Sequence, residues 1–211
     1  MRDSPLTFPQ QHFASIAGYF DAYADELARA AASVSREALD RAQALLTETL
    51  RRDGQVWSCG NGGSAAIANH LVCDHTKGVS TDTGLHPRIH SLSATIEVIT
   101  AIANDIAYDD VFAEQLRLMG RPGDLLITIS SSGNSENVVR AIRQAKTAGM
   151  ATVALTGFAG GRSAVEADVN LHVAADNYGV VEDLHQALMH VLAQYIRLAH
   201  MPPSLIGQRR F

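Results

Sequence analysis

DLLITISSSGNSENVV, residues 124–139, contains two different patterns in succession. The first part is a short, nearly continuous apolar run, which is typical of a strand buried on both faces. The last part begins with polar residues and continues with helical spacing. The small hydroxyl residues between the two parts bury little surface, but they offer O–H and backbone N–H groups to a ligand rich in acceptor oxygens. This strand–loop–helix unit therefore indicates both the fold class and the place where a ligand binds.

The same strand–loop–helix pattern recurs along the chain. Apolar or β-branched runs predict strands at residues 55–60, 88–93, 124–130, 151–158 and 169–175. Helical spacing predicts helices at residues 63–76, 94–102, 111–119, 135–148 and 181–199. Asn104 and Asp105 are expected to break the helical run before them. Strands that alternate with helices indicate an α/β fold, and we expect a doubly wound, five-stranded parallel sheet in a flavodoxin-like three-layer sandwich.

The N-terminal part of the chain has apolar side chains at three- and four-residue spacing over residues 8–52, which predicts two helices ahead of the sheet. We therefore divide the chain into an N-terminal helical extension (1–52), the sheet domain (53–200) and a C-terminal tail (201–211). The extension and the last helix have apolar faces that a lone sheet domain would leave partly exposed. Burial between subunits is expected, and the alternative is that both helices pack on their own subunit.

The composition is that of an ordinary soluble globular protein, with 46% apolar residues, 18% charged residues and a net charge of −5. The negative charge and the lack of a Lys/Arg cluster argue against a nucleic-acid partner. Cys59 and Cys73 are too few for a disulfide framework. The sequence has neither the pattern of a signal peptide nor an apolar run of membrane-spanning length. We expect a cytoplasmic protein with no membrane contact.

Two loops rich in glycine and serine follow predicted strands, where an open α/β sheet binds its ligands. One is CGNGGSA, residues 59–65, and the other contains Ser130, Ser131, Ser132 and Ser135. Neither loop fits the G-x-G-x-x-G dinucleotide pattern or has the lysine of a nucleotide P-loop, so a small phosphate ester is expected. The alternative is that Ser135 is a helix cap and the other serines form a turn, but three adjacent serines exceed what a cap needs.

Four of the nine histidines lie in two predicted helical segments, residues 69–76 and 182–190. His70 and Asp74 are four residues apart, so both side chains leave one face of the helix about one turn apart. Such a pair suits a shared metal ion, and the alternative is a histidine of the packed core. In the second segment the spacing alone does not choose among three candidates, Glu182, His185 and His190.

In these loops and helices the chain resembles the sugar isomerase (SIS) domain family. The resemblance lies in CGNGGSA, in ISSSGNSENV and in the Thr156-Gly157 pair after the fourth strand. The two histidine-bearing helices narrow it to the phosphoheptose isomerases, and it extends over essentially the whole chain. That family converts sedoheptulose 7-phosphate to D-glycero-D-manno-heptose 7-phosphate. The resemblance implies the same activity, a phosphorylated sugar as substrate, and a homotetramer with sites at subunit interfaces.

The resemblance also implies which residues contact the substrate. The serine loop of the family holds the sugar phosphate, and other positions line the sugar and its hydroxyls. Carried over to this chain, these positions are Ser130, Ser131, Ser132 and Ser135 for the phosphate, and Asn61, Gly62, Gly63, Ser64, Asn104, Asp105 and Glu182 for the sugar.

One zinc ion per subunit is implied by the same resemblance, with ligands at His70, Asp74, Glu182 and His190. The family has a glutamate at the position of Asp74 and a glutamine at that of Glu182. Two carboxylates would formally neutralise Zn²⁺, so we expect firm binding but a weaker Lewis acid. The family's RIQE reads VVED here, which removes an arginine and leaves the identity of the sugar open.

Aldose–ketose isomerisation needs a base that moves a proton between adjacent carbons through an enediol, and an acid or electrophile at the oxygens. The resemblance points to Asp74 as the base and His190 as the acid. We expect zinc as the electrophile and Glu182 as a competing base, because Asp74 is one methylene shorter than the family's glutamate. One alternative is an isomerase of another sugar phosphate. Another is a non-catalytic SIS protein that binds a partner as a tetramer, although a full ligand set weighs against it. A sugar-phosphate-sensing regulator would need a DNA-binding domain, for which the N-terminal segment is too short.

Overall fold

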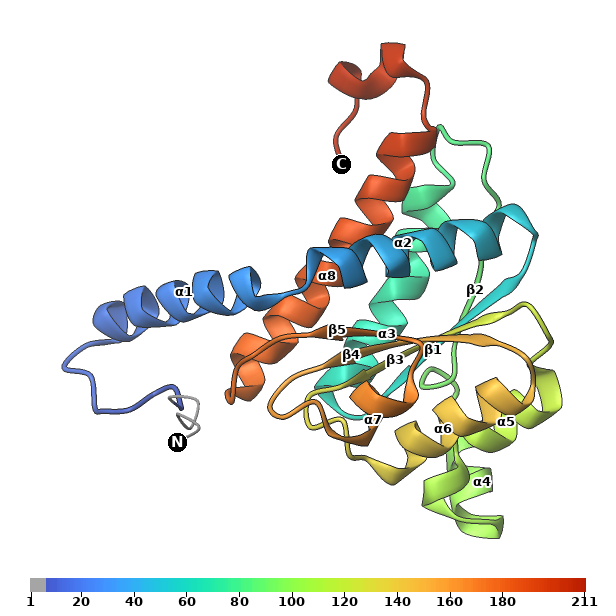
Figure 1. Ribbon diagram of the computed structural model, residues 1–211, viewed down its shortest axis with the longest axis horizontal. Helices are drawn as coiled ribbons and strands as arrows, with labels where there is room; N and C mark the ends of the chain where they lie inside the picture. Colours follow the sequence, from blue (N-terminus) through green and yellow to red (C-terminus); the bar gives the residue numbers. More distant parts are fainter. Residues whose placement is uncertain (1–6) are drawn as a thin grey trace.

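The computed structural model describes residues 7–211, so residues 1–6 of the expected N-terminal extension lie outside the described part. At its centre is a five-stranded sheet in the order β2-β1-β3-β4-β5 (Figure 1). Every neighbouring pair of strands is parallel. The strands are β1 (Gln55–Gly60), β2 (Arg88–Ser91), β3 (Leu125–Ser130), β4 (Ala151–Thr156) and β5 (Val169–His172). The expected doubly wound α/β fold is confirmed.

Helices cover both faces of the sheet (Figure 1). One face carries α1 (Ile16–Ser33), α2 (Arg36–Arg51), α3 (Gly63–Cys73) and α8 (Tyr178–His200). The other face carries α4 (Ile96–Asp105), α5 (Ala113–Met119), α6 (Glu136–Thr147) and α7 (Gly161–Glu166). Shorter helical segments are η1 (Asp74–Val79), η2 (Tyr108–Asp110) and η3 (Pro203–Gln208).

Each face of the sheet has its own hydrophobic core, because successive side chains of a strand point to opposite faces. Val56 and Ile127 belong to the core under α1, α2, α3 and α8. Trp57 and Leu126 belong to the core under α5 and α6. Nearly every side chain of the three central strands is buried, which explains why their sequences are continuous apolar runs.

Two expected helix boundaries are wrong. The first helix begins at Ile16 rather than near Phe8, because the Ser15 hydroxyl caps it by accepting a hydrogen bond from Gly18 N at 3.1 Å. Phe8 instead packs against Tyr19, with ring centroids 5.5 Å apart, so its apolar spacing reflects an aromatic cluster. The helix expected over residues 94–102 ends three residues later than expected, since Asp105 is the last residue of α4.

No helix within residues 7–211 combines the length and the apolar character that crossing a membrane requires.

A buried histidine lies in the core between α8 and the sheet. His185 is fully buried, and neither ring nitrogen has a hydrogen-bond partner among the described residues. Burial lowers the pKa of His185 from 6.5 to about 4, since the core disfavours the imidazolium. The backbone of Thr156, whose contact with the ring falls outside hydrogen-bond geometry, offsets part of this effect.

We therefore predict that the protein loses stability as the pH falls from about 6.5 towards 4. The unfolded chain takes up a proton on His185 in this range and the folded chain does not, so this group should lower the free energy of unfolding by about 3 kcal/mol. Urea denaturation at pH 7 and pH 4, with a chelator present so that metal release does not contribute, measures the difference. His185→Leu should reduce the pH dependence, and the exposed His86→Leu should not. Equal slopes in all three proteins would contradict the assignment.

Candidate active site

The serine loop lies at the carboxyl end of β3 and lines a small hollow of about 160 Å³. The first glycine-rich loop and the start of α8 complete its wall, because the carboxyl ends of parallel strands meet at one edge of the sheet. The hollow is lined by Asn61, Ser64, Ile129, Ser130, Ser131, Ser132, Ser135, Tyr178 and Glu182. The structure thus brings together the four serines expected to hold phosphate and three of the residues expected to line the sugar.

Two of the four serine hydroxyls accept a hydrogen bond from the backbone of the loop, and the other two make no hydrogen bond with the described residues. The Ser130 hydroxyl accepts a hydrogen bond from Gly133 N at 3.2 Å, and the Ser132 hydroxyl accepts one from Asn134 N at 3.2 Å. The Ser131 hydroxyl is buried and has no partner among the described residues. Ser135 stands at the start of α6 without making a side-chain capping bond. Because the Ser130 and Ser132 hydroxyls only accept in these bonds, all four hydroxyls keep an O–H that can donate to an anion, together with the helix N-terminus.

Glycine backbone packing fixes the position of the serine loop. Gly133 has a φ of +64°, and a Cβ placed on it would lie 1.9 Å from the carbonyl oxygen of Gly160. Gly157 N donates to the Ser131 carbonyl at 2.9 Å, and Ser163 N donates to the Gly133 carbonyl at 2.9 Å. The loop thus lies directly on the chain that follows β4, and no side chain larger than hydrogen fits between them.

Charged residues beside the loop hold the start of α6. The Arg162 guanidinium, helped by Arg140, holds the pKa of the Glu136 carboxyl below its usual range. Arg162 also donates to the carbonyl of Asn134 at 2.7 Å. The negative side chain in the first turn of α6 is therefore neutralised by its own partners, which leaves the helix N-terminus free to act on a ligand.

An amide pair joins the two loops. Asn61 and Asn137 donate to one another's side-chain oxygens at 2.9 and 3.0 Å, and the Tyr108 hydroxyl donates to Asn61 Oδ1 at 3.0 Å. Neither Asn137 nor Tyr108 was predicted: Asn137 lies within ISSSGNSENV but was given no role there, and Tyr108 lies outside both loops. The contacts fix Asn61 at the rim of the hollow and connect it to η2.

Glu182 lies against the start of α3 and lines the hollow of the serine loop, which we call the phosphate hollow because the serines are expected to hold phosphate. A Cβ on Gly63 would be 2.3 Å from Glu182 Oε2, so glycine is required there for the carboxylate to come this close. A negative group is favoured near a helix N-terminus. Next to Glu182, Asp183 accepts a hydrogen bond from the Tyr23 hydroxyl at 2.7 Å, which ties α1 to α8. Burial, together with the Asp183 carboxylate, raises the pKa of Tyr23 above its usual range.

A second group of titratable side chains lies farther along α3 and α8. Single ligand atoms of His70, Asp74 and His190 all lie within 4.8 Å of one another. Asp74 Oδ1 is 3.3 Å from His70 Nε2, and Asp74 Oδ2 is 2.5 Å from His190 Nδ1. The two rings are nearly perpendicular, with centroids 5.1 Å apart. We call these three residues the His–Asp–His cluster.

The His–Asp–His cluster has the donor set of a zinc site, since Zn²⁺ accepts imidazole nitrogen and carboxylate oxygen together. Asp74 begins η1, a π-helical continuation of α3, and such segments are frequent at functional sites. The Gln186 amide lies 2.9 Å from His190 Nε2 and supports the ring from the side opposite Asp74. Gln186 was not predicted, although it lies one turn before His190.

Several expected site residues lie elsewhere. Glu182 is not part of the cluster, because its carboxylate lies at Gly63 and lines the phosphate hollow. Asn104 donates to Asp105 at 2.7 Å at the exposed end of α4, and neither residue lines the hollow. The remaining expected residues, Gly62 and Gly63, form the turn that starts α3.

The hollow and the cluster lie at two ends of one helix pair. α3 and α8 both start at the carboxyl edge of the sheet, run in similar directions and pack against one another (Figure 1). Glu182 lines the hollow and His190 belongs to the cluster. Eight residues of helix separate them by about 12 Å. This separation suits a phosphorylated sugar whose phosphate and reacting carbons are at opposite ends of an open chain.

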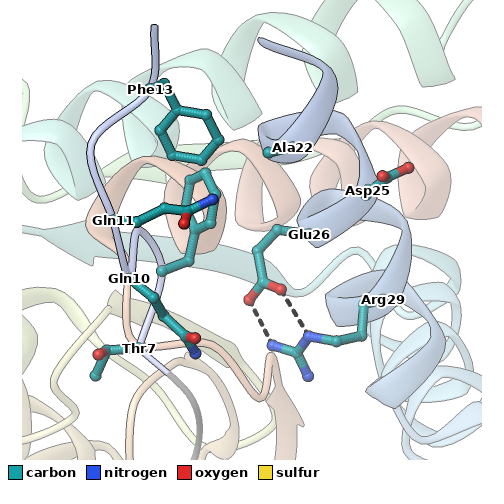
Figure 2. A pocket seen from close by; sticks show the side chains of 9 residues that line it. Thr7, Gln10, Gln11, Phe13, Ala22, Asp25, Glu26 and Arg29 are labelled. Atoms are coloured by element: carbon teal, nitrogen blue, oxygen red, sulfur yellow. Dashed lines mark hydrogen bonds and ion pairs between the residues drawn. The ribbon is translucent and has the colours of Figure 1, made fainter. Parts of the chain in front are cut away.

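A larger hollow of about 690 Å³ lies between residues 7–13 and α1 (Figure 2). Two of its three charged side chains pair with each other, since the Arg29 guanidinium donates to both carboxylate oxygens of Glu26 at 2.7 and 2.5 Å, and the third is Asp25 (Figure 2). Neither the serines nor the His–Asp–His cluster line it. Its size therefore does not make it the better candidate for a site.

The fold and the serine loop define a SIS domain protein, and the SIS domain family model matches residues 18–157. A phosphoheptose isomerase of Alteromonas mediterranea is 39% identical over 170 residues, which cover 79% of this chain and 85% of the relative. The chain belongs to the phosphoheptose isomerase family, as the resemblance in its sequence indicated.

Solved structures agree with this assignment. The phosphoheptose isomerase GmhA from Neisseria gonorrhoeae superimposes with a TM-score of 0.79 at 34% identity, covering 86% of this chain and 98% of that one. A phosphoheptose isomerase from Francisella tularensis superimposes with a TM-score of 0.78 at 28% identity, covering 87% and 96%. The similarity thus includes nearly the full length of both relatives.

Ser131→Ala is predicted to separate ligand binding from stability. Its hydroxyl is buried and has no partner within residues 7–211, so removing it should leave the free energy of unfolding unchanged or raise it by up to about 1 kcal/mol. Affinity for a sugar phosphate should fall about tenfold, because a hydrogen bond to a charged oxygen is lost. Urea denaturation and calorimetric titration measure the two effects. Ser130→Ala is the matched control and should lower stability, because its hydroxyl holds Gly133 N; unchanged affinity in Ser131→Ala would contradict the assignment.

Proposed function

We propose that the protein interconverts sedoheptulose 7-phosphate and D-glycero-D-manno-heptose 7-phosphate, as an isomerase of the family to which it belongs. Family membership and fold support an aldose–ketose isomerase. The observation that carries the proposal is the placement of a phosphate-sized hollow and a His–Asp–His cluster along one helix pair. A seven-carbon chain with its phosphate in the serine loop would present its carbonyl end near the cluster.

The serine loop would hold the phosphate through the hydroxyls of Ser131 and Ser135 and the N-terminus of α6. Binding the phosphate at a fixed distance from the cluster orients the far end of the sugar, which is where the reaction takes place. Asn61, held by Asn137 and Tyr108, would contact a sugar hydroxyl beside the phosphate.

Zinc fits the His–Asp–His cluster, and the three side chains would hold it with the fourth position open to substrate. When bound, such an ion supplies an electrophile for the carbonyl oxygen. The assignment differs from the ligand set implied by family resemblance in one respect. Glu182 lies at the phosphate hollow, so a move of its side chain would be needed before it joined the other three.

The proton transfer requires a base that takes the proton from carbon 1 and returns it to carbon 2, and an acid that exchanges protons with the two oxygens. We assign the base to Asp74 and the acid to His190, since both lie at the end of the helix pair where the reacting carbons would be. Glu182 is the competing base, but it lies about 12 Å away along α8, beside the phosphate hollow.

A homotetramer in the cytoplasm is also proposed. Val191, Tyr195 and Leu198 form an apolar row on α8 with 49%, 55% and 39% of their surface exposed. Their spacing places them on one side of the helix, next to the face that bears His190. Burial of this row between subunits would place a neighbouring chain close to the cluster, which supports sites at subunit interfaces.

The reaction itself is tested by a proton-NMR time course of zinc-loaded protein with sedoheptulose 7-phosphate, repeated after chelation. Formation of an aldoheptose 7-phosphate that stops on chelation is the expected result. No conversion by folded, metal-loaded tetramer would reject this substrate, and a panel of other sugar phosphates would follow. Conversion that persists after complete metal removal would reject zinc as the electrophile.

Asp74→Asn and Glu182→Gln are predicted to differ in their effects on turnover and on zinc content. Asp74→Asn should lose both turnover and zinc, because the central carboxylate of the cluster becomes a neutral amide. Glu182→Gln should keep zinc and most turnover, since its carboxylate lies outside the cluster. Zinc content by mass spectrometry and the NMR assay measure the two properties, with His86→Ala as a control. Loss of turnover with zinc retained in Glu182→Gln would transfer the role of base to Glu182.

A further inference from the structure

A hollow of about 400 Å³ adjoins the His–Asp–His cluster on the side away from the serine loop. Asp74 and His190 line it, and residues of η1 and the later part of α8 continue its wall. The opposite wall comes from the end of the chain, since Arg210 and Phe211 also line it. Residues far apart in sequence thus enclose the space next to the candidate reaction centre.

The C-terminal segment, residues 209–211, is fixed in this position by several contacts. Arg209 Nε donates to Asp82 Oδ2 at 2.9 Å, and Arg197 Nη1 donates to the carbonyl of Arg210 at 3.0 Å. The Arg197 guanidinium also lies 4.9 Å from the centre of the Phe211 ring. The Arg197 side chain is only 9% exposed, and it donates to Asp82 as well. A solvated tail would make none of these contacts, so the segment belongs to the wall of the hollow.

The positive charges around the hollow are not all used by these contacts. Arg197 and Arg209 are paired with Asp82. Lys77 and Arg210 line the hollow, and neither forms an ion pair with any residue in the described range 7–211. Asp74 lines the same hollow, and its carboxylate already contacts both histidines. The hollow therefore offers two free cations to a ligand with a negatively charged or oxygen-rich end.

We propose that Arg210, with Lys77 beside it, is a substrate-binding residue that holds the oxygens at the carbonyl end of the sugar phosphate against the His–Asp–His cluster. The proposal rests on the proposed function, in which negative charge develops on these oxygens as the proton leaves carbon 1. A guanidinium at this end favours the charged, enediolate-like state over the neutral substrate. Arg210 thus selects for the reacting end, and the serine loop selects for the phosphate.

Two probes of equal length separate this role from general phosphate binding. The aldonate 7-phosphate of the same sugar carries a carboxylate where the substrate has its carbonyl end, and the alditol 7-phosphate carries a neutral hydroxyl. Both are titrated calorimetrically into zinc-loaded wild-type and Arg210→Gln protein. Arg210→Gln should weaken the aldonate about tenfold and the alditol less than about twofold, because one charge-assisted hydrogen bond is lost. Arg210→Lys should restore part of the preference.

Two further variants test whether the segment positions Arg210. Asp82→Asn removes the anchor of Arg209 and Arg197, so it should weaken the aldonate in the same direction while leaving Arg210 in the sequence. Arg121→Gln removes one exposed positive charge outside the hollow and should change neither affinity. Zinc content and thermal unfolding of each variant show that the cluster and the fold are retained.

The outcomes distinguish the two proposals. Equal weakening of both probes by Arg210→Gln, or no weakening of either, would overturn the role of Arg210. Wild-type protein that binds both probes but does not convert sedoheptulose 7-phosphate would overturn the proposed reaction, and the difference between the probes would still test Arg210. Wild-type protein that binds neither probe would overturn both.

Discussion

The contact on which the site depends is the backbone-to-backbone packing of the serine loop on the glycines that follow β4. Gly133 and Gly160 come so close that a Cβ would meet a carbonyl oxygen at 1.9 Å. Because hydrogen bonds between main-chain groups hold the loop, its Ser131 side chain is not needed for structure. The Ser130 and Ser132 hydroxyls each add one bond from a backbone N–H and keep their own O–H groups for a ligand. The absence of side-chain bulk is therefore what makes the anion site possible.

The helix pair α3 and α8 sets the distance between the hollow of the serine loop and the His–Asp–His cluster. Both helices start where parallel strands end, so their first turns lie beside the phosphate hollow and their later turns lie progressively farther from it. Residues on them are separated by a fixed rise per residue. His70, Asp74 and His190 occupy one level of the pair, and Glu182 occupies another. In the proposed function, one region of the site anchors the phosphate and the other performs the chemistry.

The sequence patterns predicted the strands, the serine loop and the His70–Asp74 pair because each of these features is local, whereas His190 was implied only by the family resemblance. Alternating apolar runs and helical spacing reflect burial, and His70 and Asp74 share a helix face through their spacing alone. The position of Glu182 was not predictable in this way, since it depends on how closely α8 approaches Gly63. Tyr108 and Arg210 reach the site from segments without any catalytic pattern, through contacts that only the tertiary fold creates.

The π-helical segment at Asp74–Val79 has a consequence for how such a site can change during evolution. A π-turn accommodates one more residue than an α-turn, so deletion of a single residue there would restore regular helix. The side chains within the segment would change direction, while the parts before and after it would keep theirs, because the wide turn takes up the extra residue. Lys77 lies within this segment and would change its direction relative to the hollow, while His70, upstream of the deletion, would keep its own. In this helix, substrate preference is open to change by insertion and deletion as well as by substitution.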